Sequence, residues 1–328
     1  MERKLGRSDL TVSAMGYGCW AIGGPWTMGD GPAGWGEVDD NESIAALHKA
    51  FDLGITFYDT AANYGAGHSE RILARAFADR RDRVVIATKF GYHVDEAARR
   101  VVTYGDEKTG DVVTPLRADC EASLRRLDTE AIDLYQFHVN AYDAEKAAEV
   151  RDALEDLVAA GKVRYYGWST DNPEGARVFA EGEHCVAIQN NMNVIHDAPA
   201  MIAVCEALNL ASINRGPLGM GMLTGKYTRD STWGKDDVRT REWFQQAYQK
   251  LILGALPAIR DVLTSGGRTL AQGALAWLWG RSEMTIPIPG IRTVAQAEEN
   301  AGAMQFGPLT PDQMAEIERL LGREHAAA

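Results

Sequence analysis

Four polar side chains in the 328-residue sequence are of the types that move protons, and three of them end an apolar run. Asp59 ends ITFYD, Lys89 ends RVVIATK and His138 ends IDLYQFH, whereas Tyr64 lies in the glycine-containing segment after Asp59. A phenol has an ordinary pKa near 10, so it is a poor acid at neutral pH unless a nearby cation stabilises its phenolate. Lys89 can supply that cation, and Asp59 can keep the lysine charged and oriented. His138 can hydrogen-bond a substrate oxygen beside the phenol. The set predicts a general acid aimed at an oxygen atom.

The four side chains can meet only if their apolar runs are neighbouring strands, and the sequence predicts this arrangement. Eight β-type runs alternate with amphipathic helical segments, and several runs are apolar on both faces, as in parallel strands covered by helices. Eight such units form a (β/α)₈ barrel, in which active-site residues lie at the carboxyl ends of the strands. The expected strands are 14–18, 55–59, 83–89, 132–138, 163–169, 185–189, 210–214 and 284–289. The expected helices are 42–53, 69–77, 115–127, 144–160, 173–180, 198–208, 243–265 and 294–303.

We therefore expect one α/β domain over residues 1–328, with an N-terminal β-hairpin cap and long loops over the C-terminal face of the barrel. The alternative is a doubly wound sheet, because Gly16, Gly18 and Ala21 match G-x-G-x-x-A with Asp39 about twenty residues later. The segment IGGPWTMGDGPAGWGEV that follows is too rich in proline and glycine to start the helix that a pyrophosphate would need. The segment VVTYGDEKTGDVV is predicted to be a hairpin tip.

Composition narrows the possible partners. The formal net charge is −12 and no window clusters Lys and Arg beside aromatic residues, so nucleic acids and anionic membranes are not expected as partners. The polar N-terminus MERKLGRSDL does not resemble a secretory signal, and we expect a cytoplasmic protein. The four cysteines are scattered without a CxxC pair, and the seven histidines show no metal-ligand spacing, so reduced thiols and no metal site are expected. The sequence leaves monomer and homo-oligomer open.

Four segments in separate parts of the chain, FYDTAANYG, ATKFG, LYQFH and YGWS, resemble signature segments of the aldo-keto reductases in the same order. The resemblance covers essentially the whole chain. It implies a (β/α)₈ barrel in which Asp59, Tyr64, Lys89 and His138 form a catalytic tetrad. It also implies that NADPH, in preference to NADH, delivers hydride reversibly to an aldehyde or ketone while Tyr64 protonates the oxygen.

The same resemblance implies a set of cofactor contacts. Ser169, Thr170 and Gln189 match positions that hold the nicotinamide carboxamide, although Thr170 replaces a common asparagine. In NRGPLGMGMLTGKY, Arg215 replaces the usual aromatic residue that stacks on the nicotinamide. In IPGIRTVAQAEEN, Arg292 is the main cation for a 2′-phosphate, because Gly290 and Gln296 replace basic residues. The remaining expected contacts are Trp20, Gly216, Pro217, Leu218, Gly221, Leu223, Lys226, Glu299 and Asn300. The first of these two segments can also be interpreted as a solvated loop, and the second as a solvated helix face.

Three long connections, 22–40, 91–114 and 227–241, should cover the site, because loops of this length in a barrel are usually functional. Trp20, Trp26, Trp35 and Tyr92 are the expected walls of the substrate pocket, although the tryptophans could instead pack the loops onto the barrel. Only 28 residues follow Asn300, part of them in the helical segment DQMAEIERLLG, and we expect an open, permissive pocket.

Two other functions remain open at this point. Barrels of the aldo-keto reductase family also serve as redox-sensing regulatory subunits with little turnover, and an intact tetrad does not exclude that function. A lyase or isomerase barrel that binds no nicotinamide is the third possibility.

Overall fold

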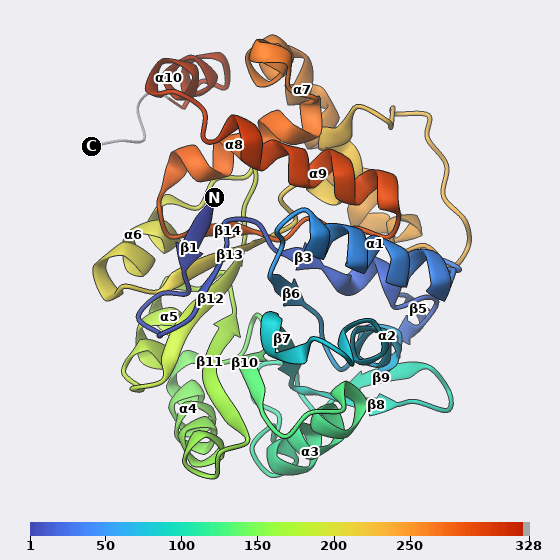
Figure 1. Cartoon of the computed structure of the whole chain (residues 1–328), viewed down its shortest axis with the longest axis vertical. Helices are drawn as coiled ribbons and strands as arrows, with labels where there is room; N and C mark the ends of the chain where they lie inside the picture. The colour runs from blue at the N-terminus through green and yellow to red at the C-terminus, as the bar shows by residue number, and fades with distance from the viewer. Residues whose placement is uncertain (324–328) are drawn as a thin grey trace.

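Eight parallel strands form the centre of the protein in the computed structural model, which describes residues 1–323 (Figure 1). Their order in the sheet is β14-β13-β12-β11-β10-β7-β6-β3. The sheet closes on itself through a parallel bridge between Gly18 and Gly290. The strands are β3 (Tyr17–Gly18), β6 (Phe57–Asp59), β7 (Val85–Phe90), β10 (Ile132–Phe137), β11 (Val163–Ser169), β12 (Cys185–Asn191), β13 (Ala211–Arg215) and β14 (Thr285–Pro287). The predicted barrel is confirmed.

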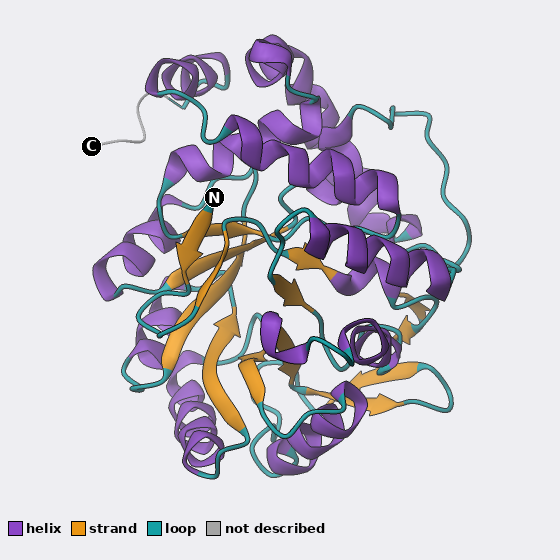
Figure 2. Ribbon diagram, viewed as in Figure 1, coloured by secondary structure: helices purple, strands orange, loops and turns teal. Residues whose placement is uncertain are grey.

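Helices surround the strands on the outside of the barrel (Figure 2). Their apolar faces and the outer faces of the strands form one large buried core. The helices are α1 (Asp40–Asp52), α2 (His68–Phe77), α3 (Leu116–Leu127), α4 (Ala144–Ala159), α5 (Pro173–Ala180), α6 (Pro199–Leu208), α7 (Gln249–Thr264), α8 (Leu270–Arg281), α9 (Val294–Phe306) and α10 (Pro311–Leu320).

Helix α8 was not predicted from the sequence. It reads LAQGALAWLWGR, and nine of its residues are buried, so it has no polar stripe from which a helical period could be recognised. The helix packs against β14 and lies in contact with α7, α9 and α10. The helix expected at 243–265 after β13 is formed by α7 and by the π-helical turn Phe244–Tyr248 that precedes it. Because α8 follows α7, two helices lie between β13 and β14.

Two small sheets flank the barrel. The expected N-terminal hairpin is confirmed as the antiparallel pair β1 (Glu2–Lys4) and β2 (Thr11–Ser13). The other sheet, in the order β5-β4-β9-β8, joins two of the long loops, since β4 (Thr27–Met28) of the first pairs with β9 (Arg100–Thr103) of the second. The remaining members are β5 (Gly31–Pro32) and β8 (Tyr92–Asp95). The hairpin tip was wrongly placed at 101–113, because β8 and β9 turn at 96–99 and residues 104–110 form a later turn.

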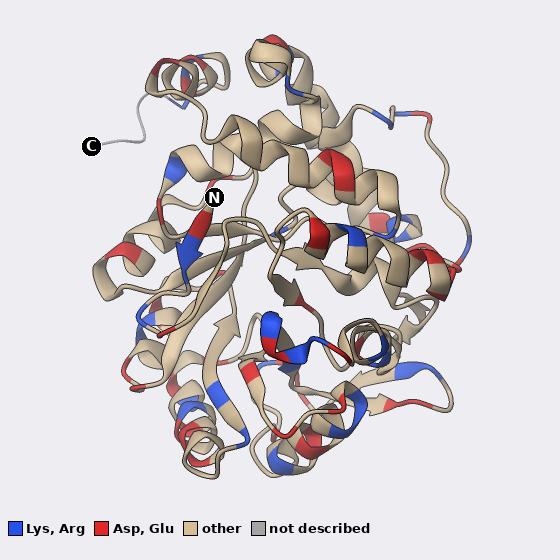
Figure 3. Ribbon diagram, in the orientation of Figure 1, with Lys and Arg blue, Asp and Glu red and all other residues tan. Residues whose placement is uncertain are grey.

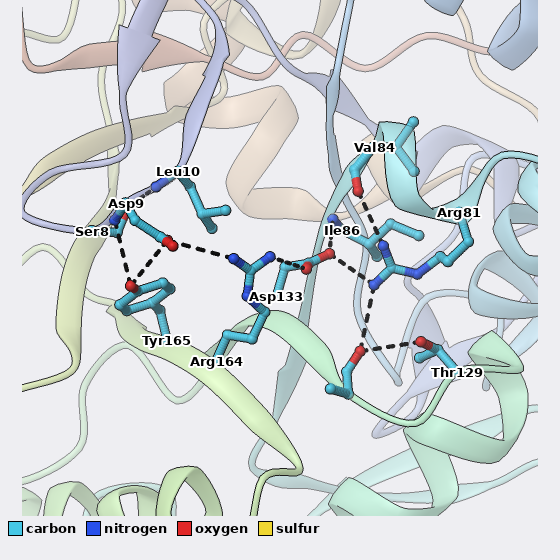
Figure 4. A network of polar contacts seen from close by, with 11 residues as sticks. Ser8, Asp9, Leu10, Arg81, Val84, Ile86, Thr129, Asp133, Arg164 and Tyr165 are labelled. Atoms are coloured by element: carbon cyan, nitrogen blue, oxygen red, sulfur yellow. Dashed lines mark hydrogen bonds and ion pairs between the residues drawn. The ribbon is translucent and has the colours of Figure 1, made fainter.

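A buried carboxylate joins several strands at the end of the barrel opposite the long loops (Figure 4). Asp133 of β10 accepts hydrogen bonds from Arg81 (2.7 Å), Arg164 (3.0 Å) and the backbone N–H of Ile86 (3.0 Å). Arg164 also contacts Asp9 of the N-terminal hairpin. The carboxylate therefore has two cationic partners, although only 6% of its surface is exposed.

Replacing Asp133 with asparagine is expected to lower the free energy of unfolding by about 2–4 kcal/mol, because an amide cannot accept from both guanidinium groups and leaves buried donors unpaired. Urea denaturation measures the loss. Asp9→Asn is the matched control, since Asp9 belongs to the same network but its side chain is 69% exposed. The control should cost less than about 1 kcal/mol. Equal unfolding free energies of Asp133→Asn and Asp9→Asn would contradict the stabilising role of the buried Asp133 carboxylate.

Charges of both signs alternate along the outer helices, for example on α3 and α4 (Figure 3). Among residues 1–323, none of the helices is long and apolar enough to cross a membrane. No group of three or more His, Cys, Asp or Glu side chains within the same range is arranged to hold a metal ion.

Candidate active site

The structure brings the predicted proton-transfer residues together at the carboxyl ends of three neighbouring strands. The Lys89 Nζ atom lies 2.5 Å from Asp59 Oδ1, 2.8 Å from the carbonyl oxygen of Thr60 and 3.4 Å from the Tyr64 hydroxyl. Asp59 and Lys89 are each only 1% exposed, whereas Tyr64 is 9% exposed and lines a cleft. The ammonium thus connects a buried carboxylate to a phenol that a ligand can reach.

Burial and charge act in opposite directions on this pair. Burial raises the pKa of Tyr64 above its ordinary value, while Lys89 lowers it without outweighing burial. Lys89 therefore acts on Tyr64 in the expected direction, but burial has the larger effect and the pKa of Tyr64 is raised overall. Burial alone would lower the pKa of Lys89, but Asp59 and the Tyr64 hydroxyl raise it above its ordinary value. At neutral pH Tyr64 is protonated and Lys89 is charged, as a proton donor and its electrostatic partner must be.

His138 follows β10 and faces Tyr64 across the cleft. Its ring lies edge-on to Tyr64, with the ring centroids 5.9 Å apart, and edge-on to Tyr92 at 5.7 Å. Burial, and then the charges of Lys89 and Arg215, hold the pKa of His138 well below its usual range. The imidazole is therefore neutral at physiological pH and can donate one hydrogen bond to an oxygen beside Tyr64.

A cleft of about 1000 Å³ extends from this group across the mouth of the barrel to the start of α9. Asp59, Tyr64 and His138 line it, while Lys89 lies beneath the floor. All but two of the residues expected to contact cofactor or substrate line the same cleft. They are Trp20, Trp26, Trp35, Tyr92, Ser169, Gln189, Arg215, Gly216, Pro217, Leu218, Gly221, Lys226, Gly290, Arg292, Gln296, Glu299 and Asn300.

Two expected cofactor residues lie outside the lining, and this corrects the sequence-based set. The Thr170 hydroxyl donates to the carbonyl oxygen of Asn140 at 2.9 Å, so it stabilises a loop, and Asn140 lines the cleft instead. Leu223 is fully buried in the hydrophobic core because its side chain turns inward from the glycine-rich segment.

The residues beside Tyr64 form a network that fixes Arg215. Its guanidinium donates to Asp171, which also accepts from the Asn140 amide at 2.9 Å and from the backbone N–H of Asn191 at 2.7 Å. Arg215 lies close enough to the catalytic group to lower the pKa of both Tyr64 and His138. Arg215 is therefore held in place at the end of β13, next to the predicted proton donor.

The other half of the cleft is suited to an extended anionic ligand. Gly216 and Gly221 have left-handed backbones, with φ of +64° and +93°, and a Cβ at Gly216 would lie 2.9 Å from Asn191 Oδ1. The backbone can therefore approach a ligand closely at both positions. Helix α9 begins at Val294 at the far end, where Arg292 and Gln296 line the cleft. The Lys226 ammonium is partnered by Glu299 at 3.3 Å. These features fit a dinucleotide with its phosphates beside the glycines and the helix start.

Trp20 and aromatic side chains of the long loops line the half of the cleft that contains Tyr64. Trp20 stacks on Tyr64 with ring centroids 6.0 Å apart and meets Trp35 edge-on at 5.2 Å. Trp26 lines the cleft and is also buried against Tyr64 and Ala33, so it serves both as pocket wall and as loop packing. None of the described residues 301–323 lines the cleft.

The third long loop reaches over the cleft and binds the first. The Arg239 guanidinium lies over the rings of Trp233 (3.8 Å), Trp35 (4.8 Å) and Tyr227 (5.0 Å), and Asp237 holds it by two hydrogen bonds. The Val238 N–H donates to the carbonyl oxygen of Gly34 at 2.7 Å. The two loops therefore form one continuous cover.

Several site residues were not singled out from the sequence. Asn140 and Asp171 belong to loops without a recognisable motif, and their importance appears only when three strand ends meet. Gln136 carried a usable signal, because in LYQFH it alternates with His138 and so faces the same side of the strand. A polar side chain at an inward position of an apolar strand indicates a partner inside the barrel.

The chain is similar to known proteins along nearly its whole length. It is 30% identical over 314 residues to the aldo-keto reductase yakc (NADP(+)) of Schizosaccharomyces pombe, covering 92% of this chain and 86% of that protein. It is 28% identical over 331 residues to the NADH-specific methylglyoxal reductase of Escherichia coli, covering 99% and 98%.

Two solved structures show the same arrangement of the whole chain. The glycerol dehydrogenase AKR11B4 of Gluconobacter oxydans matches with a TM-score of 0.81 at 30% identity, covering 100% of this chain and 97% of that one. An aldo-keto reductase of Klebsiella pneumoniae in complex with NADPH matches with a TM-score of 0.67 at 26% identity, covering 99% and 97%. The model of the Aldo/keto reductase family matches residues 14–321. The chain therefore belongs to the aldo/keto reductase family and is an NAD(P)H-dependent oxidoreductase.

Proposed function

We propose that the protein reduces aldehydes or ketones to alcohols, reversibly and with NADPH, and that Tyr64 is the general acid. The observation that carries this proposal is the position of the Lys89 ammonium, between the Asp59 carboxylate and the Tyr64 hydroxyl at the wall of the cleft. A phenol that lines a cleft and contacts a buried cation is equipped to protonate an oxygen.

Each of the four side chains has a separate role in carbonyl reduction. The Tyr64 O–H donates its proton to the carbonyl oxygen as that oxygen gains negative charge. Lys89 stabilises the resulting phenolate, and Asp59 keeps the lysine charged and in place. His138, neutral at physiological pH, donates a hydrogen bond that orients the same oxygen. A nicotinamide cofactor in the adjoining half of the cleft supplies the hydride.

Residues of the cofactor half are placed to hold that group. Arg215 would stack on the nicotinamide, and Ser169 and Gln189 would contact its carboxamide, since all three line the cleft. NADPH is favoured over NADH by Arg292, whose guanidinium is hydrogen-bonded, among residues 1–323, only to the backbone carbonyl of Trp35 at 3.2 Å. The name of the fission yeast relative specifies NADP(+), whereas that of the E. coli relative specifies NADH.

The first test is a fluorescence titration with NADPH and NADH, followed by NADPH oxidation with a broad panel of aldehydes and ketones. Tighter binding of NADPH and many turnovers with several aldehydes are expected. Oxidation of no more than one NADPH per protein would favour the redox-sensing subunit. Failure to bind either dinucleotide would favour the lyase or isomerase. A steep preference for one compact aldehyde would contradict a permissive pocket.

Replacing Arg292 with alanine is expected to weaken NADPH binding by about tenfold while leaving NADH binding little changed, because only NADPH carries the 2′-phosphate that the guanidinium would contact. The measurement is the ratio of the two dissociation constants by fluorescence titration. Arg117→Ala is the control, since Arg117 is exposed on α3 outside the cleft. An equal loss of affinity for both cofactors would show that Arg292 does not select the phosphate.

A further inference from the structure

Both carboxylate oxygens of Asp59 accept hydrogen bonds, and Lys89 is only one of the donors. Its Oδ1 atom faces Lys89, whereas Oδ2 accepts from Gln136 Nε2 at 3.0 Å and from Gln189 Nε2 at 2.8 Å. The two glutamines are also joined, because Gln189 Nε2 donates to Gln136 Oε1 at 3.2 Å. Gln136 is fully buried and does not line the cleft.

The strand register explains how these side chains meet. Gln136 lies beside Lys89 across the β10–β7 pair and beside Gly167 across the β10–β11 pair. Strand β11 separates Gln136 from Gln189, but residue 167 contributes no side chain to the space between them. A Cβ at that position would lie 2.3 Å from the carbonyl oxygen of Ala187. No side chain of residue 167 therefore stands between Gln136 and Gln189, and the two amides are hydrogen-bonded directly.

The chemistry of the groups sets the direction of every hydrogen bond. An ionised carboxylate only accepts, so both amides must turn their NH₂ groups toward Asp59. Gln136 then has its oxygen free to accept from Gln189. Both N–H groups of Gln189 are occupied in this way, and only its carbonyl oxygen remains for a ligand in the cleft.

We propose that Gln136 is a positioning residue of the active site, which holds Asp59 against Lys89 and orients Gln189 with its carbonyl oxygen toward the nicotinamide half of the cleft. This inference rests on the proposed function. Gln136 touches neither substrate nor cofactor. It acts through Asp59 on the Lys89–Tyr64 pair and through Gln189 on the cofactor carboxamide, and so it links proton transfer to cofactor placement.

Two substitutions separate this role from simple packing. Gln136→Met keeps nearly the same shape but removes both hydrogen bonds, and it is expected to lower kcat at least tenfold at every pH and to weaken NADPH binding, because Gln189 loses an acceptor that orients it. Gln136→Glu places a second carboxyl group against Asp59. Because that group is buried beside a like charge, its pKa is expected to rise toward neutrality or above, so that at low pH its protonated form donates to Asp59 as the amide does.

In Gln136→Glu we expect kcat to decrease at high pH, a decrease that the wild type does not show. Gln136→Glu should have nearly wild-type kcat at pH about 6 and lose at least tenfold by pH about 9, as the introduced carboxyl group ionises. The charged or titratable side chains that face Asp59 and Tyr64 from the surrounding elements are Cys19, Lys89, Tyr92, His138 and Arg215.

None of these neighbouring side chains should cause the kcat of the wild type to decrease between pH about 6 and pH about 9. Burial raises the pKa of Cys19 and of Tyr92, the pKa of Lys89 is also raised, and the pKa of His138 lies well below its usual range. The arginine stays charged throughout. The wild-type kcat should therefore change little between these two pH values.

Thermal unfolding of the cofactor-free protein provides a readout that does not depend on activity. A group whose pKa is raised in the folded state contributes stability at low pH and loses it as pH rises through the folded-state pKa. Gln136→Glu should therefore come closest to the wild-type melting temperature near pH 4, below the unfolded-state pKa of about 4.3, and fall progressively further below it as the pH rises to about 9. This measurement still tests the contact with Asp59 if the wild type reduces no carbonyl compound, an outcome that would end the proposed function instead.

Ser212→Ala is the matched control, because the Ser212 hydroxyl is also fully buried and hydrogen-bonded, to Asn190 and Asn214, away from Asp59. It should lower the melting temperature without altering the pH profile. Wild-type kcat in Gln136→Met, or a pH profile of Gln136→Glu that parallels the wild type in both activity and melting temperature, would overturn the inference. If Gln136→Met does not fold, the pH dependence of Gln136→Glu decides the question alone.

Discussion

Replacing Tyr64 with phenylalanine is expected to lower kcat for carbonyl reduction by about 10²–10⁴-fold, the usual contribution of a general acid. The substitution removes only the hydroxyl, which lies 3.4 Å from Lys89 Nζ. The ring stacked on Trp20 is retained, so the cleft keeps its shape and NADPH affinity should be nearly unchanged. Steady-state assays with an aldehyde, together with a fluorescence titration, measure both quantities.

Tyr135→Phe serves as the control for this substitution. The Tyr135 hydroxyl, on a neighbouring part of the barrel, is buried and has no hydrogen-bond partner within residues 1–323, so its removal should leave kcat at the wild-type value. Wild-type turnover in Tyr64→Phe, or an equal loss in both variants, would refute the assignment of Tyr64 as proton donor.

Lys89→Met should damage both activity and stability. Without the ammonium, the developing phenolate loses the cation that contacts it and keeps only the weaker effect of Arg215, so we expect kcat to fall by an amount comparable to that for Tyr64→Phe. The substitution also leaves the Asp59 carboxylate as a buried charge without its cation, which should cost about 3–5 kcal/mol of unfolding free energy. Urea denaturation and the aldehyde assay measure the two effects separately.

The double variant, Lys89→Met together with Asp59→Asn, separates the effect of Lys89 on activity from its effect on stability. Neutralising the carboxylate should restore much of the lost stability while leaving the enzyme inactive, because the phenolate still lacks the cation that contacts it. Recovery of activity together with stability would show that Lys89 only supports the fold. An unchanged unfolding free energy in the single variant would contradict the buried ion pair.

The cluster of Asp59, Tyr64, Lys89 and His138 was predictable because the positions of these residues are set by local pattern. An apolar run that ends on Asp59 or Lys89 is a strand whose last residue reaches the mouth of a barrel, and the order of strands in the chain is also their order in the sheet. Tyr64 follows from the short loop after Asp59. The N-terminal hairpin and the cover formed by the long loops were predictable for the same reason.

Features that depend on non-local contacts were not predictable. Helix α8 has no period to recognise, because neighbouring elements bury most of its surface. The pairing of β4 with β9 joins residues more than 70 positions apart in sequence, and no motif marks it. Thr170 turned away from the cleft because Asn140 accepts its hydroxyl, and the pKa of Tyr64 depended on how strongly burial opposes Lys89. In each case the deciding partner comes from another strand or loop.

The most direct test of the account is transfer of deuterium from NADPH labelled at both C4 positions to an aldehyde. The account predicts an alcohol with one deuterium on the former carbonyl carbon, in large molar excess over the protein, and a strongly reduced rate in Tyr64→Phe. Deuterium-free alcohol, product limited to one equivalent per protein, or equal rates in both proteins would contradict it.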